Sequence, residues 1–564
     1  MVFHRLRGTG NASEHGDQSL LGIMERSPLH LRMMRAPRGC NATTCLLLCG
    51  ALTALYILYS LHSLQELVKT QQRSLVHHIE QLKHVQQPAA SHHGGEVHGG
   101  EQHRTADDGG KGDVYLPNTR SIPTLWLMSK SVHHLNHVIT VFERAGFQIV
   151  RQPAPRTDVL WSYEYPFSGG WRAAIHKMRH PQKVNHFPGS GFITNKMSLS
   201  TSKIKYLPKA YKIPSDVDAL KKSAKSNPKK MFVMKSNDHR GIKIKTLADM
   251  DLSEKGRLNF VQEFVDKPYL VDGRKFDIGV YVVIASINPL RVYMYEEEVL
   301  LRFCTVDYHP LDVTNVEKYV IGDKYTPTSQ IPSLKHSIID LQYSMKQTLN
   351  VHLKSKGFDP EKLWSQIRTS IREVTTSKEK EIKVAMATYP DPKVFFEMVR
   401  FDFVIDDLLN LWLMEVNMSP NLSSSIHPEN AIMYEQVIFN TLALVGAAHY
   451  VAGPLVKLND QERAMTVRKS DVIVPVDECS QDKCKHCEAE ICALCQQCMS
   501  DEQLGIFKQA FQEQVHRRNF VRLFPIPPSG KTDPGLSHDV PSVPNTVMRH
   551  WYAAKCRHSP AWCM

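Results

Sequence analysis

Two carboxylates and one amide fall within a single hairpin pattern near the middle of the chain. The stretch from Met398 to Ser423, MVRFDFVIDDLLNLWLMEVNMSPNLS, places two apolar runs around a polar turn, which is the pattern of a β-hairpin. With the turn centred near position 408, Asp402 falls opposite Glu415. Asn417 lies beside Glu415, because strand residues two apart share a face.

These three side chains have the chemistry of a magnesium site. Hard cations prefer oxygen ligands, and Mg²⁺ bound with a nucleotide usually takes one or two carboxylates plus phosphate oxygens. The alternative is a hairpin with solvated acids. Glu415 lies inside the apolar run LWLMEV, where an unpaired buried charge would be costly. We therefore interpret Asp402, Glu415 and Asn417 as metal ligands.

A second set of charges lies in the apolar stretch KFDIGVYVVIAS, which precedes a turn at Asn288-Pro289. Lys275, Asp277 and Gly279 share one face of the predicted strand by alternation. A Lys and an Asp inside an apolar strand need a partner or a function. A satisfied structural ion pair is the alternative.

A phosphate-binding loop is the third candidate. Lys229–Leu247, KKMFVMKSNDHRGIKIKTL, reads as a short strand, a polar loop and a second β-rich run. Lys235 ends the first strand, and the loop offers Arg240, Gly241 and backbone N–H groups, which together cradle phosphates in loops of this kind. An ordinary hairpin is the alternative.

The elements around these residues alternate between strands and helices. Leu125–Met128 and Val159–Trp161 are predicted to be buried strands, with a helix at Asn136–Ala145 between them. A mostly helical region follows Lys335, and Asn430–Val451 is predicted to be a closing helix. This order indicates an α/β fold.

Composition limits the class of partner. The chain has 564 residues, 42% of them hydrophobic, enough for a large core and more than one domain. Its formal charge of +12 fits an acidic partner such as nucleic acid, a membrane surface or acidic protein tails. The sequence has no recognisable DNA- or RNA-binding signature, so we expect no nucleic acid.

The N-terminal part predicts a membrane anchor. After a polar, basic tail at 1–44, residues 45–64 read CLLLCGALTALYILYSLHSL, about the length of a membrane-spanning helix. Four arginines precede this segment closely and three basic residues follow it. By one charge, the positive-inside rule favours a lumenal or extracellular catalytic part. We expect a single-pass membrane protein and leave the side of the catalytic domain open.

A stalk and linker are predicted at 65–114. Leu61, Val68, Leu75 and Leu82 recur every seven residues, which indicates a short coiled coil that would make the protein a homodimer. A solvated helical spacer is the alternative. Residues 88–113 are rich in Gly, His, Gln and Asp and are predicted to be a disordered linker.

Eight cysteines crowd the C-terminal region at 455–564. Their C-x-x-C pairs are compatible with a zinc site, and their even number is compatible with disulfides. We favour disulfides, because they agree with the charge bias around the membrane segment. The eight are Cys479, Cys484, Cys487, Cys492, Cys495, Cys498, Cys556 and Cys563.

The D-(x12)-E-x-N arrangement followed by SPNLS resembles the metal-binding end of the tubulin–tyrosine ligase-like family. TDVLWSYEYP and the segment Asn185–Ser202, NHFPGSGFITNKMSLSTS, resemble the family's entry motifs. The resemblance runs from about Leu125 to Pro454. It implies an α/β (α+β) ATP-grasp ligase core at 115–454, with ATP and Mg²⁺ as cofactors, glutamate as co-substrate and the acidic tails of tubulin in microtubules as acceptor.

The resemblance also implies roles for individual residues. Lys275, Asp277 and Arg302 would be catalytic. The segment at Gln262–Val265 would meet adenine, and DVTN at Asp312–Asn315 resembles the family's H-L-T-N segment. The nucleotide would then be bound by Lys196, Lys235, Arg240, Gly241, Gln262, Glu263, Phe264, Val265, Lys275 and Asn315.

The chain departs from the family pattern at two places. Gly279 stands where the family has an arginine in K-F-D-x-R, and the loop has Ser236 and Lys243 in place of a proline and a second glycine. Three functions therefore stay open. They are a tubulin polyglutamylase-like ligase acting through an acyl phosphate, a catalytically weak or inactive ATP-grasp scaffold, and a lumenal ligase acting on a protein other than tubulin.

Overall fold

The computed structural model describes residues 122–153, 157–235, 242–250, 260–447, 467–527 and 542–563. The chain divides into two units, Met1–Val114 and Tyr115–Met564, and all described residues belong to the second. The predicted membrane segment, stalk and linker lie outside the described residues and stay predictions. Among the residues that are described, no helix is long and apolar enough to cross a membrane.

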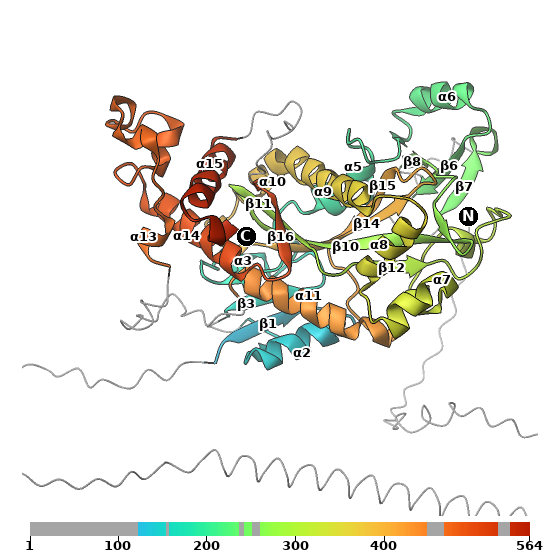
Figure 1. The fold of residues 1–564 in the computed structure, drawn as a ribbon, viewed down its shortest axis with the longest axis horizontal. Helices are drawn as coiled ribbons and strands as arrows, with labels where there is room; N and C mark the ends of the chain where they lie inside the picture. Colours follow the sequence, from blue (N-terminus) through green and yellow to red (C-terminus); the bar gives the residue numbers. More distant parts are fainter. Residues whose placement is uncertain are drawn as a thin grey trace, which may run out of the picture. The chain divides into compact units, whose positions relative to one another are not determined.

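A long central strand, β10 (Arg274–Ile287), organises the largest sheet (Figure 1). Nearly every residue of RKFDIGVYVVIASI is buried, as expected for a strand covered on both faces. The sheet has eight strands in the path β13-β12-β10-β11-β16, with β14 and β9 also on β10 and β15 on β14. The other strands are β9 (Leu270–Val271), β11 (Leu290–Tyr295), β12 (Leu300–Phe303), β13 (Thr326–Pro327), β14 (Glu397–Ile405), β15 (Leu411–Asn417) and β16 (Phe520–Phe524).

Alternation along β10 directs its side chains into two different cores. Ile278, Val280 and Val282 belong to a cluster that includes residues of α9 (Pro360–Ser377). Residues on the opposite face, such as Val283, pack with α11 (Ala431–Leu444). The odd-numbered face is therefore the α11 face, and Asp277 and Gly279 lie on it because strand side chains have a period of two.

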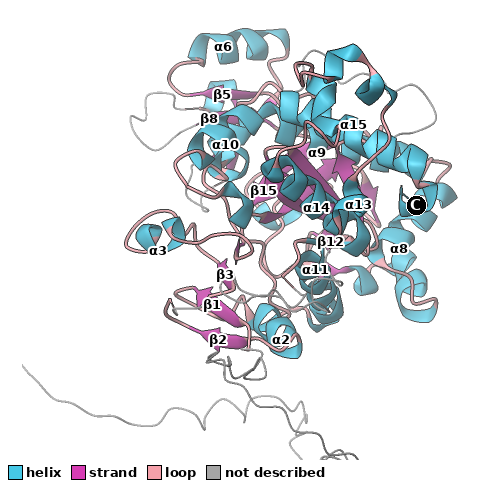
Figure 2. Ribbon diagram, turned by 90° about the vertical axis from the view of Figure 1, so that its left-hand side faces the viewer, coloured by secondary structure: helices cyan, strands magenta, loops and turns pink. Residues whose placement is uncertain are grey.

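The first sheet of the described part is parallel, as the sequence indicated. Its order is β2-β1-β3-β4, and α2 (Asn136–Arg144) follows β1 and packs on α11. Figure 2 shows its strands and α2 grouped together at one end of the molecule. The strands are β1 (Thr124–Met128), β2 (Gln148–Val150), β3 (Val159–Ser162) and β4 (Lys183–Val184), and short helices follow at α3 (Arg172–His176), α4 (Gly191–Thr194) and α5 (Lys196–Ser200).

A smaller antiparallel sheet carries the predicted phosphate loop. Its order is β5-β8-β6-β7, and α6 (Val217–Ser226) covers it. The strand–loop–strand prediction at 229–247 is confirmed by β6 (Met231–Lys235) and β7 (Lys243–Thr246). The other two strands are β5 (Ala210–Lys212) and β8 (Phe260–Glu263).

The predicted helical region after Lys335 is confirmed. It contains α8 (Met345–Ser355), α9 and α10 (Glu379–Met386), preceded by α7 (Pro332–Lys335). Asp359 and Pro360 explain the start of α9, because the aspartate side chain accepts from the N–H of Glu361 and proline occupies the first helical position. The closing helix is confirmed as α11, which ends at Leu444.

The C-terminal region joins the main sheet. β16 pairs antiparallel with β11, and α14 (Asp501–His516) and α15 (Val543–His558) form a separate apolar cluster beside it. Short helices lie at α13 (Lys469–Val472) and α16 (Pro560–Cys563). No pattern in this region indicated that it would extend the sheet.

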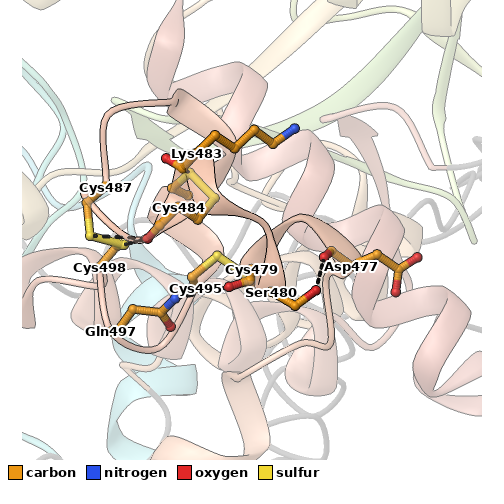
Figure 3. The surroundings of a disulfide bond; sticks show 10 residues. Asp477, Cys479, Ser480, Lys483, Cys484, Cys487, Cys495, Gln497 and Cys498 are labelled. Carbon is orange, nitrogen blue, oxygen red and sulfur yellow. Dashed lines mark hydrogen bonds between the residues drawn. A yellow bond between two sulfur atoms is a disulfide. The ribbon is translucent and has the colours of Figure 1, made fainter.

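All eight predicted cysteines of this region form disulfides, as favoured over zinc. Figure 3 shows three of the bonds, Cys479–Cys495, Cys484–Cys492 and Cys487–Cys498, within one compact segment. The fourth, Cys556–Cys563, joins α15 to α16. Cysteine sulfurs that are bonded to each other are not available as zinc ligands.

Candidate active site

The predicted hairpin is present with the predicted register. β14 and β15 pair so that Asp402 lies opposite Glu415 and Arg400 lies opposite Asn417, with a bulge after Asp402. β14 also pairs with β10, which places Asp402 opposite Gly279. Three neighbouring strands therefore bring the metal candidates and the β10 candidates onto one surface of the sheet.

The three predicted metal ligands converge on one point. The Asn417 amide nitrogen lies 2.9 Å from Asp402 Oδ2 and 3.1 Å from Glu415 Oε1. The other oxygen of Glu415 lies 3.1 Å from Lys196 Nζ. Two carboxylates thus surround a single donor group, where a cation would find two anionic ligands.

These residues fit a magnesium ion on the chemistry of the donor set. Rotation of the Asn417 amide would present its oxygen to the point between the carboxylates, and Mg²⁺ needs only one or two protein carboxylates when phosphates complete its shell. Within the described part of the chain, no group of three or more His, Cys, Asp or Glu side chains could hold a metal ion. The candidate trio reaches three ligands only through the amide.

A network of ion pairs lies next to the metal candidates. Arg302 on β12 donates to both oxygens of Asp277, at 2.9 and 2.7 Å, and to Asp402 at 2.9 Å. Burial raises the pKa of Asp277, and the Arg302 charge opposes that rise. Burial alone would lower the pKa of Arg302, but Asp277 raises it. Arg302 is therefore a fixed cation that joins the β10 and β14 carboxylates.

The ammonium group of Lys275 contacts Tyr319 and is not part of this ion-pair network. Its ammonium donates to the backbone oxygen of Tyr319 at 2.7 Å, and burial lowers the pKa of Lys275. The close ionic partner of Asp277 is Arg302, so the alternative of a simple Lys275–Asp277 structural pair does not describe the contacts. Lys275 is a buried cation beside a cavity.

That cavity has the features of a nucleotide slot. It measures about 170 Å³, and its lining combines apolar residues, including Val233, Ile242 and Met414, with charged ones. Nucleotide sites commonly combine apolar walls with a few placed polar groups. Of the predicted residues, the lining includes Lys196, Gln262, Glu263, Phe264, Val265, Lys275, Asp277 and Glu415.

The side chains of Gln262 and Glu263 already have protein partners. Gln262 donates to the backbone oxygen of Pro208 at 3.1 Å, and Glu263 lies 2.8 Å from Lys230 Nζ. The backbone N–H groups of Glu263 and Phe264 also donate within the protein, to the backbone oxygens of Lys209 and Met231, so contact of this segment with adenine stays a prediction.

A larger cavity of about 770 Å³ shares Lys196 and Glu415 with the slot. Its lining also contains Arg302, Arg400 and Asn417, and it includes the polar residues His134, Tyr163, Tyr325, Asn421 and His427. The volume is in the range of small-molecule sites. Of the metal candidates, Glu415 therefore borders both cavities and Asn417 borders the larger one, whereas Asp402 is buried and lines neither.

Four predicted residues are not placed in this site. Arg240 and Gly241 lie outside the described residues, and Lys235 is the last residue of β6. Asn315 caps the short helix Val316–Lys318, where its side chain accepts from the N–H of Glu317 at 3.1 Å. It does not line either of the two cavities described above.

Sequence reasoning missed Arg400. Its guanidinium donates to both oxygens of Asp402, at 2.6 and 2.9 Å, and the residue is almost fully buried. The signal was available, because EMVRFDF places an arginine two residues before Asp402 on the same strand face.

Comparisons with known proteins agree with this geometry. Residues 175–452 match the model of the tubulin-tyrosine ligase family. The chain is 40% identical over 440 residues to the "Probable tubulin polyglutamylase ttll-15" of Caenorhabditis elegans, covering 76% of this chain and 84% of that protein.

Less similar relatives match about half of the chain. The tubulin polyglutamylase ttll6 of Danio rerio is 30% identical over 48% of this chain and 37% of its own length. The tubulin monoglutamylase TTLL4 of Homo sapiens is 28% identical over 48% of this chain and 24% of its own length. The chain thus spans less than half of these two relatives.

Proposed function

Because the chain belongs to the tubulin–tyrosine ligase family, we propose that it is an ATP- and Mg²⁺-dependent ligase that joins an amino acid, foremost glutamate, to a carboxylate of a protein. One observation carries the proposal. Asp402, Glu415 and Asn417 converge on one another, and Glu415 borders both the slot and a second, polar cavity. A ligase that uses a nucleotide and an amino acid needs two such adjoining spaces.

The acidic and the basic residues of the site would have different roles. The acceptor carboxylate would take the γ-phosphoryl group of ATP, giving an acyl phosphate and releasing ADP. The amine of the amino acid would then attack the acyl carbon, forming the amide bond and releasing inorganic phosphate and a proton. Asp402, Glu415 and Asn417 would hold Mg²⁺. Lys275, Arg302 and Lys196 would bind and orient phosphate oxygens, so that catalysis rests on positioning and fixed charges.

Tubulin is the first candidate acceptor. The relatives are named for tubulin glutamylation, and a formal charge of +12 favours association with acidic protein tails. This version of the function requires the catalytic unit to be in the cytosol.

The disulfides favour a second candidate, a ligase that acts on a secretory-pathway protein. Four disulfides are typical of an oxidising compartment. Because β16 is hydrogen-bonded to β11, the disulfide-bonded region and the ligase site belong to one folded unit. They must therefore lie on the same side of a membrane, and the positive-inside bias at residues 45–64 favours the lumenal side.

Incorporation of labelled glutamate tests the ligase function. The full chain with ATP and MgCl₂ is expected to label an acceptor protein, and Glu415→Gln is expected to reduce the rate by at least about 100-fold, because a fixed charge at the metal is lost. Arg468→Gln, on an exposed ion pair far along the chain, is the matched control. Absence of labelling by wild-type protein with every amino acid and both acceptor classes would favour the inactive scaffold.

Protease protection tests the compartment. An epitope after Met564 is followed in sealed microsomes with and without detergent. Digestion without detergent would make tubulin the acceptor to pursue. Protection until detergent is added would exclude tubulin for that population and direct the search to secretory proteins.

A further inference from the structure

The side chain of Arg400 occupies the space that a side chain at position 279 would need. A Cβ atom at position 279 would lie 2.9 Å from Arg400 Cδ and 3.2 Å from Arg400 Nε. The aliphatic part of Arg400 therefore lies directly across the backbone of Gly279. Only a residue without a side chain leaves room for this arginine, because atoms at such distances overlap.

Arg400 lies further from the nucleotide slot than Asp402 does, level with Asn417 on the neighbouring strand. Along β10, Lys275 borders the slot, Gly279 pairs with Asp402 in the next strand, and Tyr281 pairs with Arg400. At about 3.3 Å per residue, the Lys275 and Tyr281 rows are about 20 Å apart. Arg400 lines the larger cavity but not the slot. Arg400 is therefore placed to meet an anion in the larger cavity.

The guanidinium has donors to offer. Asp402 takes the hydrogen bonds from Nε and one terminal nitrogen, which is two of the five N–H donors of arginine. A guanidinium recognises a carboxylate through paired, charge-assisted hydrogen bonds. The larger cavity thus has a cationic wall formed by Arg302 and Arg400, suited to a small carboxylate.

We propose that Arg400 binds a carboxylate of the incoming amino acid in the larger cavity. Because Gly279 has no side chain, Arg400 on the neighbouring strand has room to reach this cavity. This inference rests on the proposed ligase function. It also accounts for the glycine in the KFDIG segment. The family pattern K-F-D-x-R places an arginine on β10 at the position of Gly279. In this chain the guanidinium at the same surface is that of Arg400 on β14, so the site keeps a cation although position 279 has no side chain.

Binding of the amino acid, measured without turnover, tests the proposal. Equilibrium dialysis of labelled glutamate is performed with the full chain, MgCl₂ and a non-hydrolysable ATP analogue. Arg400→Gln is expected to weaken glutamate binding by about 10- to 100-fold, the range expected for a lost charge-assisted hydrogen bond. Affinity for the ATP analogue is expected to change by less than about threefold, and Arg468→Gln is expected to bind both as wild type does.

A strand-swapped variant separates recognition from folding. Arg400→Gly alone is expected to lose glutamate binding. The double variant Gly279→Arg/Arg400→Gly returns a guanidinium to the same surface from β10, and it is expected to recover most of that binding. Arg400→Lys keeps the charge but not the paired donors and is expected to be intermediate.

Each result of these binding measurements would either support or overturn the inference about Arg400. Equal glutamate binding by wild type and Arg400→Gln would overturn the inference, as would a wild-type chain that binds the ATP analogue but none of the common amino acids. Equal losses of glutamate and nucleotide affinity would also overturn it, because they indicate a structural role. A wild-type chain that binds glutamate through Arg400 but never transfers it would support the inference and refute the ligase function.

Discussion

Arg291 on β11 and Glu513 on α14 form a fully buried ion pair. Two hydrogen bonds of 2.7 and 3.0 Å join them, and Tyr293 donates to the same carboxylate at 3.0 Å. The pair connects a central strand of the ligase sheet to a helix that lies more than 200 residues further along the chain. Together with β16, it makes the C-terminal region part of the catalytic unit.

Loss of the Glu513 charge is expected to destabilise the whole unit. Glu513→Gln leaves Arg291 buried without its counter-ion, and breaking a buried pair in this way costs about 3–5 kcal/mol. Denaturant unfolding of the purified chain measures the loss.

The double variant Arg291→Met/Glu513→Leu controls for size and shape. Replacing both partners by apolar residues is expected to recover most of the stability, because no charge is left unpaired. A Glu513→Gln protein as stable as wild type would contradict the structural role given to the pair.

The disulfide segment is expected to depend on its bonds. The double variant Cys479→Ser/Cys495→Ser opens a loop with a sequence separation of 16, and closure of such a loop contributes about 3 kcal/mol. Alkylation before and after reduction, followed by peptide mass spectrometry, reports whether the eight paired cysteines are protected. Alkylation of all eight in the unreduced, denatured chain would show that the bonds are absent.

The hairpin and its neighbours could be predicted from the sequence because their information is local. Alternation of apolar residues around the turn near position 408 was enough to place Asp402 opposite Glu415. The strand pairs at 231–246 and 274–295 were visible for the same reason. The resemblance named Lys196 for the nucleotide site, and Lys196 lines the slot, but its contact with Glu415 was not expected.

Other features depended on contacts between distant segments. The sequence shows that Arg400 lies in an apolar strand, but not that it fills the space above Gly279 on a neighbouring strand. The pairing of β16 with β11 joins residues more than 200 positions apart, and no local pattern encodes it. Asn315 matched a motif, yet its side chain is engaged in capping a short helix, because Asn is equally suited to that role.

Gly279 and Arg400 are expected to be coupled in stability. Gly279→Ala places a methyl group 2.9 Å from Arg400 Cδ, and overpacking of this kind costs about 1–3 kcal/mol. In an Arg400→Ala background the closest contact is gone and Asp402 Oδ1, at 3.3 Å, is the close neighbour that remains, so the same substitution is expected to cost about 1 kcal/mol less. Denaturant unfolding of the four proteins gives the coupling energy. An equal cost in both backgrounds would contradict the close contact.

Glu298 is expected to make stability fall as pH rises. Burial raises its pKa from 4.5 to about 7, although the carboxylate accepts hydrogen bonds from the N–H groups of Val299 and Lys346. Between these two values the folded chain keeps a proton that the unfolded chain has lost. Stability therefore declines as pH rises through this window, by up to about 3 kcal/mol.

Glu298→Gln removes this pH dependence because its amide cannot ionise, while the side-chain oxygen can still accept both hydrogen bonds. The variant is expected to be more stable than wild type at pH 8, by up to about 3 kcal/mol, and close to wild type at pH 5. Unfolding at the two pH values measures the difference. Glu297→Gln, at the exposed neighbouring position, is the matched control and is expected to follow wild type. A Glu298→Gln curve parallel to that of wild type would show that Glu298 is ionised in the folded chain throughout this range.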